Sequence, residues 1–294
     1  MKILFIHQNF PGQYVHIIQR LSRNGGHQLV ALSINQLDES RGLPSHLQHF
    51  RYQLRRGNSK GVHPLLLETE SKVIRAEACA NAAQRLKNQG FTPDLICAHP
   101  GWGESLFLKA VWPEVPLLCY QEFFYQEHGF DTGFDPEFPD EIGWESQARL
   151  HMKNAYLYLT LEQADWNISP THFQASSFPE HYRRRFSVIH DGIDLRRAVH
   201  NSSPNPLKLP DGTLLESGQP IVTFVNRKLE PYRGCHTFLR SIPELQKCCP
   251  EARIVIVGGT TGVSYGAVCP QGEWKDRYLA EIDGQYDPSH VHFT

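Results

Sequence analysis

Two arginines in one short stretch have the types and spacing to bind an anion. Arg227 and Arg233 lie in FVNRKLEPYRGCHTF, with Pro231 between them and Gly234 directly after. An apolar run ends before the first arginine and an apolar pattern of helical spacing starts after the second, so the pair spans a predicted strand–loop–helix junction. Guanidinium groups and the free N–H groups of a helix start both bind phosphate oxygens. The stretch fits a phosphate site, and on charge alone two solvated surface arginines are an equal alternative.

A phosphate site of this kind needs a sheet whose strands end at one edge beside helix starts. Residues 1–195 alternate between short apolar runs and longer helical patterns, as in repeated β/α units. Strands are predicted at 2–6, 28–32, 94–98, 116–120, 166–169 and 187–190, and helices at 14–21, 70–88, 104–111 and 148–164. Thr171 is a predicted N-cap of a further helix.

The chain changes character after residue 195. Residues 196–219 include NSSPNP and LPDGT and lack a helical period, which predicts a linker or a small hairpin at a domain boundary. Residues 220–294 then resume the β/α pattern, with strands predicted at 221–225, 253–257 and 291–293 and helices at 234–247 and 274–281. We therefore predict an α/β fold of two Rossmann-like domains. The second domain is expected to be incomplete, because a doubly wound domain usually has about five or six strands.

Composition and charge limit the classes of partner. The 294 residues are 40% hydrophobic and 20% charged, which suits a globular chain of two domains. A net charge of −2 gives no general attraction to nucleic acid. Seven scattered cysteines, an odd number without metal-ligand spacing, favour a reducing, cytoplasmic compartment. No run approaches the roughly 18–20 apolar residues of a membrane span, so membrane contact would be peripheral, with 183–185 as its candidate.

Seven motifs follow one another in an order that resembles a known family. They are HQNFPGQY (7–14), AHPGWGE (98–104), GFDPEFP (133–139), SPTHFQ (169–174), SVIHDGID (187–194), NRKLEPYRG (226–234) and RIVIVGG (253–259). Together they resemble a bacterial subgroup of the family 4 glycosyltransferases of GT-B fold. The resemblance covers nearly the whole chain.

The resemblance implies transfer of a hexose from a nucleoside-diphosphate sugar to a glycan or lipid-linked acceptor. It implies retention at the anomeric carbon and no metal cofactor. Arg227 and Arg233 would neutralise the departing diphosphate, although most members of the family have lysine at the second position. The glycines expected near the donor are Gly12, Gly234, Gly258 and Gly259.

The acceptor side of the resemblance points to polar residues at predicted strand ends. The family often has a polar residue, commonly histidine, after the strand that ends here at Tyr120, and Gln121 and Glu122 are the matching candidates. His99 ends the preceding strand and would face the acceptor. A buried structural histidine and a surface carboxylate are the plainer interpretations of His99 and Glu122. The DGID turn at 191–194 is expected to be architectural.

Two other patterns suggest different chemistry without matching it. Acidic residues gather in the long aromatic stretch 121–141, but their spacing fits no calcium loop and better suits an acceptor-side loop; they are Asp131, Asp135, Glu137, Asp140 and Glu141. The glycines from Gly258 to Gly266 miss the G-x-G-x-x-G spacing, so no dinucleotide site is expected.

Two alternatives to a transferase stay open. A nucleotide-sugar 2-epimerase shares the architecture but needs paired carboxylates and histidine that the sequence alone does not locate. A non-catalytic glycosyltransferase fragment that acts as a partner subunit is supported only by the short second domain, which also leads us to expect weak activity from this chain alone. The sequence leaves the sugar, the nucleotide base and the acceptor undefined.

Overall fold

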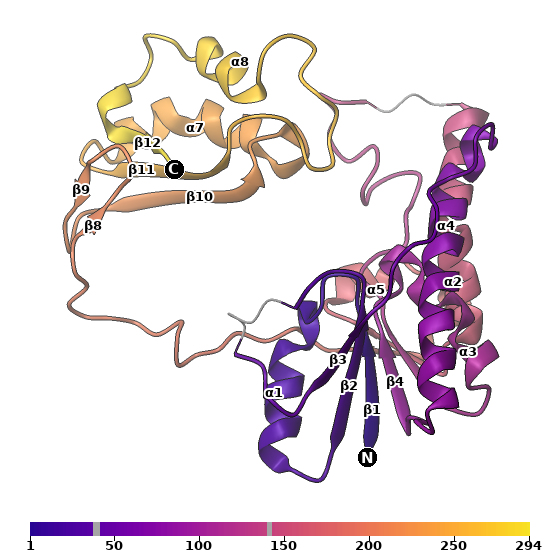
Figure 1. The fold of residues 1–294 in the computed structure, drawn as a ribbon. Helices are drawn as coiled ribbons and strands as arrows, with labels where there is room; N and C mark the ends of the chain where they lie inside the picture. Colours follow the sequence, from indigo (N-terminus) through magenta and orange to yellow (C-terminus); the bar gives the residue numbers. More distant parts are fainter. Residues whose placement is uncertain (38–41, 140–142) are drawn as a thin grey trace. The chain divides into compact units, whose positions relative to one another are not determined.

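The computed structural model describes residues 1–37, 42–139 and 143–294, and the chain forms two compact units. The first unit comprises Met1–Ile193 and the second comprises Asp194–Thr294 (Figure 1). Each unit is built on its own parallel sheet. The predicted α/β fold is therefore confirmed.

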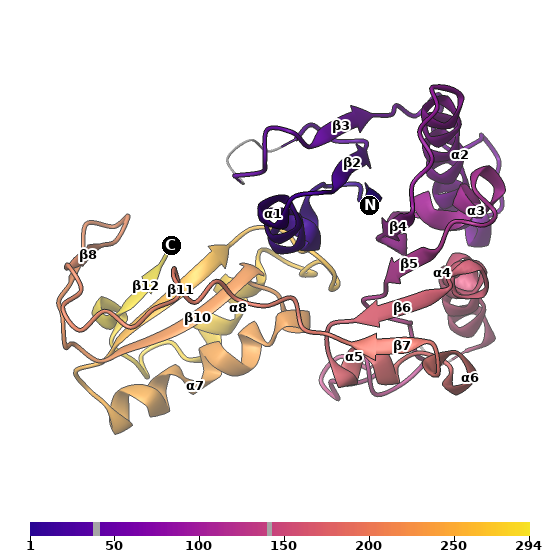
Figure 2. The same ribbon diagram turned by 90° about the horizontal axis from the view of Figure 1, so that it is seen from below.

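Seven parallel strands form the sheet of the first unit, in the order β3-β2-β1-β4-β5-β6-β7 (Figure 2). The strands are β1 (Lys2–Ile6), β2 (Gln28–Ser33), β3 (Gln48–Arg51), β4 (Leu95–Ala98), β5 (Leu117–Tyr120), β6 (Trp166–Ser169) and β7 (Phe186–Val188). The order grows outward in both directions from β1 and β4. These two neighbours are therefore the topological switch point, where ligands of open α/β sheets bind beyond the carboxyl ends of the strands.

Helices cover both faces of this sheet because successive strand residues alternate between the faces. Leu4, Ile6 and Ile96 pack with apolar residues of α2 (Leu67–Asn88), whereas Ile3 and Phe5 pack with Ile18 of α1 (Val15–Asn24). The remaining helices are α3 (Leu108–Val111), α4 (Trp144–Gln163), α5 (His172–Ser176) and α6 (Glu180–Arg183), with 3-10 turns at Gly12–Tyr14, Pro64–Leu66, Pro100–Trp102 and Glu104–Phe107. Thr171 caps α5 as expected, since its hydroxyl accepts from the Gln174 N–H at 3.1 Å.

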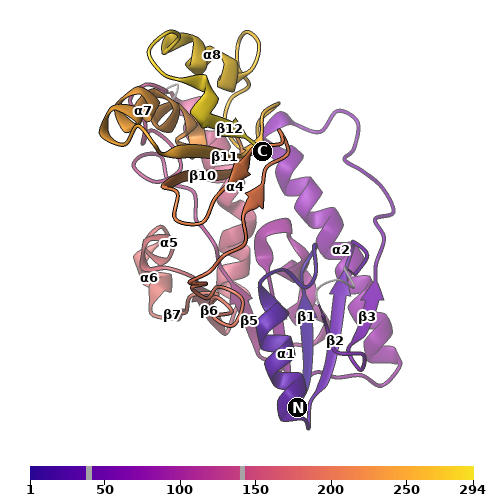
Figure 3. The same cartoon turned by 90° about the vertical axis from the view of Figure 1, so that its left-hand side faces the viewer.

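Three parallel strands form the main sheet of the second unit, in the order β10-β11-β12. They are β10 (Ile221–Lys228), β11 (Arg253–Gly259) and β12 (Val291–Phe293). Both longer helices, α7 (Cys235–Cys248) and α8 (Trp274–Glu281), lie on one face of this sheet (Figure 3), and 3-10 turns occupy Pro231–Arg233 and Pro288–His290. A small antiparallel hairpin, β8 (Leu207–Lys208) and β9 (Leu214–Leu215), packs Leu209 and Leu215 against Val255 of β11.

Two predicted strands of the second unit were too short, and one strand of the first unit was not predicted. β10 continues past Val225 to Lys228, and β11 continues through Gly259. β3 was not expected, because its sequence QHFR has a single apolar residue. No helix in the described ranges has the length and apolar character needed to cross a membrane, and all seven cysteines are free thiols.

Candidate active site

Three strands of the first unit end in polar residues at the switch point. His7 directly follows β1, His99 follows β4, and Gln121 and Glu122 follow β5. β4 lies between β1 and β5, and the His99 N–H donates to the Ile6 carbonyl at 2.9 Å. The sheet order therefore brings together two histidines that are far apart in the sequence.

The two histidines are held in the same way. The Asn9 N–H donates to Nδ1 of His7 at 3.0 Å, and the Gly101 N–H donates to Nδ1 of His99 at 3.1 Å. An Nδ1 that accepts a hydrogen bond carries no proton, so each neutral ring has its proton on Nε2. Both rings are 3% exposed, and their centroids lie 5.0 Å apart in an edge-to-face arrangement.

Both histidines connect to Glu122. Nε2 of His99 lies 3.3 Å from Oε2 of Glu122, while the Gln13 amide donates to Oε1 of Glu122 at 2.9 Å. Oε1 of Gln13 in turn lies 2.9 Å from Nε2 of His7. The Glu122 side chain is 48% exposed, so it is the point at which this buried network reaches solvent.

The network shifts the ionisation of its members. Contact with His99 is the main reason that the pKa of Glu122 lies below its usual value, so Glu122 is a carboxylate at neutral pH. Burial, and secondarily the neighbouring His99, lower the pKa of His7 to about 4. His7 is therefore neutral at neutral pH. The arrangement offers an ionised acceptor backed by imidazole N–H groups.

Glycines make room for both rings. A Cβ at Gly12, where φ is +49°, would lie 2.4 Å from Nε2 of His7. A Cβ at Gly101 would lie 2.7 Å from Cε1 of His99. Gly12 thus has a structural reason to be glycine, and its contact with the donor stays a prediction.

The neighbours of Glu122 at the end of β5 have structural partners. Gln121 is fully buried, and its amide donates to Oδ1 of Asn167 at 3.0 Å within the sheet. The Tyr120 hydroxyl donates to Asp191 at 2.6 Å, which ties the DGID turn to β5. Of the two candidates after Tyr120, Glu122 is the one that contacts His99 and connects to His7 through Gln13.

In the second unit, Arg227 lies inside β10 and not after it, which corrects the predicted position. The pairing of β10 with β11 shifts between Val225 and Lys228, so Arg227 sits in an irregular part of the ladder. Arg227 is exposed, and within the described residues no hydrogen bond or ion pair involves its side chain. The side chain is therefore a cation available to an anionic ligand.

Arg233 has partners, unlike Arg227. Its guanidinium lies 4.9 Å from the centroid of the Tyr265 ring, and its Nε is 3.9 Å from Oε1 of Glu230. Glu230 is fully buried, and its Oε2 accepts hydrogen bonds from the N–H groups of Ser264, Tyr265 and Gly266 at 3.0, 3.3 and 3.0 Å. Glu230 thereby holds the loop after β11 against the segment that carries Arg233.

The predicted donor-side glycines have different surroundings. Gly234, with φ of +77°, is the N-cap of α7, and a Cβ at this position would have no described heavy atom within 4 Å beyond its chain neighbours. Gly258 and Gly259 belong to β11, which continues past the predicted strand end at residue 257. A Cβ at Gly258 would lie 2.5 Å from the Asn226 carbonyl oxygen, so this glycine permits close approach of the irregular part of β10.

No cluster of three or more potential metal ligands occurs within 1–37, 42–139 and 143–294. In the acidic stretch, Asp131 accepts from the Gln126 N–H and Asp135 accepts from the Glu137 N–H. These carboxylates stabilise local turns. Asp140 and Glu141 lie outside the described residues.

The family assignment rests on a sequence model that covers most of the first unit. The model of the glycosyl transferase family 4 group matches residues 25–198, more than half of the chain. The chain therefore belongs to this family group, and the resemblance inferred from its motifs is confirmed. No curated protein is significantly similar in sequence.

Solved structures share the fold at low identity. A glycosyltransferase from Rickettsia africae aligns with 100% of this chain and 67% of its own length, at 14% identity and a TM-score of 0.55. Apo UGT2 of Phytolacca americana aligns with 100% of this chain and 72% of its own, at 11% identity and a TM-score of 0.51. MnaA from S. aureus, in a complex with UDP, aligns with 99% of this chain and 67% of its own length, at 13% identity and a TM-score of 0.50. These likenesses show the GT-B fold.

Sequence reasoning named His99, Glu122 and the arginines but missed four residues that hold them. His7 and Gln13 connect to Glu122, Lys72 donates to the loop after His99, and Glu230 neighbours Arg233. The signal for His7 was its place directly after the first strand of a β/α/β unit, next to the switch point. Lys72 and Glu230 carry no comparable sequence signal.

Proposed function

We propose that this protein transfers a hexose from a nucleoside-diphosphate sugar to a hydroxyl group of a glycan or lipid-linked acceptor. The transfer retains the anomeric configuration and uses no metal cofactor. Membership of the family 4 group supports the reaction class. One solved structure of this fold is a complex with UDP, which supports a nucleotide as part of the donor.

The observation that carries the proposal is the convergence on Glu122 at the switch point. A half-exposed carboxylate, in contact with buried His99 and with Gln13, can accept a hydrogen bond from a sugar or acceptor hydroxyl. Its orientation is fixed by partners that are themselves packed. Such fixed charges outside the carboxyl ends of parallel strands are well placed to orient a reacting hydroxyl.

On the donor side, Arg227 and Arg233 neutralise the diphosphate leaving group, a role that a metal ion can have elsewhere. Breaking the bond between C1 of the hexose and the diphosphate oxygen leaves the electron pair on the diphosphate. Guanidinium groups that pair with phosphate oxygens stabilise that charge. The exposed Arg227 is the freer of the two, while Arg233 keeps a fixed direction beside Glu230 and Tyr265.

Proton NMR of the purified chain with a panel of nucleotide sugars and simple glycan acceptors tests this function. Enzyme is used at a concentration close to that of the sugar nucleotide, so that slow turnover is measurable. The expected result is a new glycoside of retained configuration together with free nucleoside diphosphate, unaffected by EDTA. Inversion at C2 of an otherwise intact nucleotide sugar would instead identify the 2-epimerase, and no reaction with any donor would favour the non-catalytic alternative.

A further inference from the structure

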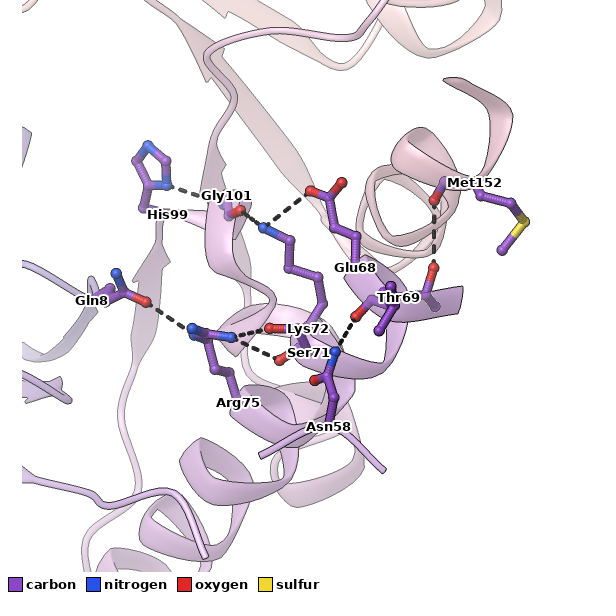
Figure 4. Close-up of polar contacts among 11 residues, drawn as sticks. Gln8, Asn58, Glu68, Thr69, Ser71, Lys72, Arg75, His99, Gly101 and Met152 are labelled. Carbon is purple, nitrogen blue, oxygen red and sulfur yellow. Dashed lines mark hydrogen bonds and ion pairs between the residues drawn. The ribbon is translucent and has the colours of Figure 1, made fainter. Parts of the chain in front are cut away.

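A lysine on α2 reaches the loop that follows His99. Nζ of Lys72 donates to the Gly101 carbonyl at 2.6 Å, and Figure 4 shows this bond beside the one from Gly101 to His99. Lys72 and His99 thus contact the same residue from two sides. The contact joins the helix on one face of the sheet to the end of β4.

The environment of Lys72 holds its ammonium group in place. The side chain is 13% exposed, Nζ lies 4.8 Å from the centroid of the Tyr156 ring, and Oε1 of Glu68 is 3.6 Å away. Burial lowers the pKa of Lys72. A lysine packed in this way serves the protein's own backbone and is not free to meet a substrate.

The loop at residues 100–103 packs closely against both α2 and the His99 ring. A Cβ at Gly101 would lie 2.7 Å from Cε1 of His99, and a Cβ at Gly103, where φ is +102°, would lie 2.6 Å from the Lys72 carbonyl oxygen. The backbone of the loop therefore lies directly against both the helix and the ring. A small displacement of Gly101 would change the hydrogen bond that its N–H gives to Nδ1 of His99.

We propose that Lys72 is a positioning residue that, through Gly101, fixes the tautomer and the orientation of His99. With Nδ1 occupied by the Gly101 N–H, the ring proton is on Nε2, which lies 3.3 Å from Glu122. The value of this arrangement for catalysis rests on the proposed function. The tautomer itself is a property of the protein without substrate, so the two ideas can fail separately.

His7 supplies the internal comparison. Its Nδ1 accepts from the Asn9 N–H in a turn of the same length, but Lys72 contacts the His99 loop and not this one. If the short turn alone were enough, both rings would behave alike when Lys72 is changed. If Lys72 acts through Gly101, only His99 would respond.

The experiment measures the imidazole nitrogen resonances of the neutral rings by long-range ¹H–¹⁵N correlation, with His7→Gln and His99→Asn spectra used for assignment. Wild type is expected to show one Nε2–H pattern for each ring. In Lys72→Met, which keeps the apolar stem, His99 is expected to show a mixture of tautomers or a protonated Nδ1, while His7 is unchanged. Lys72→Arg keeps a donor and is expected to retain the wild-type pattern.

Lys87→Met is the matched control, because Lys87 also lies on α2 and its Nζ donates to a backbone carbonyl, that of Val111. It should leave both histidines unchanged. An unaltered Nε2–H pattern of His99 in folded Lys72→Met overturns the proposal, and so does an equal response of His7. If Lys72→Met does not fold, Lys72→Gln is measured under the same two criteria. The glycosyl transfer assay then reports separately whether kcat falls with KM unchanged.

Discussion

His99 and Glu122 face each other across the ends of adjacent strands, with 3.3 Å between Nε2 of the ring and Oε2 of the carboxylate. The ring is 3% exposed and the carboxylate 48%. One partner is therefore fixed in the packed interior while the other meets solvent. This asymmetry lets the protein present a charge of defined direction at the switch point of the sheet.

Removing the charge of Glu122 tests its role. Glu122→Gln keeps the shape of the side chain but cannot attract a reacting hydroxyl as strongly, so turnover of the sugar nucleotide should fall by roughly 10²-fold. Initial rates of nucleoside diphosphate release measure the effect. Glu127→Gln, a change at another carboxylate of the same stretch that contacts Gln147, is the control and should stay within about twofold of wild type. Equal rates in Glu122→Gln and wild type would remove Glu122 from the site.

His7 should make the protein less stable in mild acid. Its folded pKa is about 4 and its unfolded value is 6.5, so the unfolded chain binds more protons between these limits. The contribution of neutral His7 to stability is complete above pH 6.5, the pKa in the unfolded chain. It is lost as the pH falls towards about 4, the pKa in the folded protein. From about pH 7 to about pH 5 this group should lower the free energy of unfolding by about 2 kcal/mol.

Urea denaturation of His7→Gln at both pH values measures that contribution, because other titrating groups affect variant and wild type alike. The loss of stability on acidification should shrink by about 2 kcal/mol. The exposed His16, on α1, provides the control His16→Gln, whose acid dependence should match wild type. An unchanged acid dependence in His7→Gln would contradict a buried, neutral His7.

Gly12 and Gly90 separate the cost of backbone strain from the cost of contact with His7. Both have positive φ, +49° and +87°, so alanine at either position should destabilise by about 1–2 kcal/mol through strain. Gly90 ends α2, where the Phe91 N–H donates to the Leu86 carbonyl. Only at Gly12 would the new Cβ meet a side chain, which adds about 1–3 kcal/mol of overpacking. The denaturation midpoint of Gly12→Ala should therefore be the lower one. If Gly90→Ala were the more destabilising change, the packing of Gly12 on His7 would be wrong.

Glu230 should hold the loop after β11. Glu230→Ala removes the acceptor of three backbone N–H groups, which should lower the free energy of unfolding by about 2–4 kcal/mol. Hydrogen exchange of the Ser264, Tyr265 and Gly266 amides should become faster. Glu273→Ala is the control, since its carboxylate accepts one N–H, that of Gly262, in the same loop. Slow exchange at all three amides in Glu230→Ala would mean that the loop is held by other contacts.

β1, β6 and β12 begin and end where the sequence suggested. For β1 the reason is its apolar run, Ile3 to Ile6, which is buried. β3 and the end of β10 are polar strands at sheet edges, where one side of the strand lacks a neighbour. Arg227 was therefore placed after a strand that in fact contains it.

Site residues could be predicted where a polar residue directly follows an apolar run. They could not be predicted where only the order of strands in the sheet brings residues together. His99 and Glu122 each follow an apolar run, which marked them as candidates. That His7 lies beside His99 depends on β1 pairing with β4, a contact over more than ninety residues. Lys72 lies near the start of the predicted helix 70–88, and its bond to Gly101 depends on how α2 packs on the sheet.

Calorimetric titration of nucleoside diphosphates into the chain tests the central claim, that the second unit binds the donor diphosphate through Arg227. Wild type is expected to bind at least one nucleoside diphosphate. Arg227→Ala should weaken this binding about tenfold or more, because one charge-assisted contact is lost. Arg253→Ala is the control, because Arg253 begins β11 and its guanidinium donates to the Ser289 carbonyl. Equal affinity of Arg227→Ala and wild type, or no binding by wild type, would contradict the account.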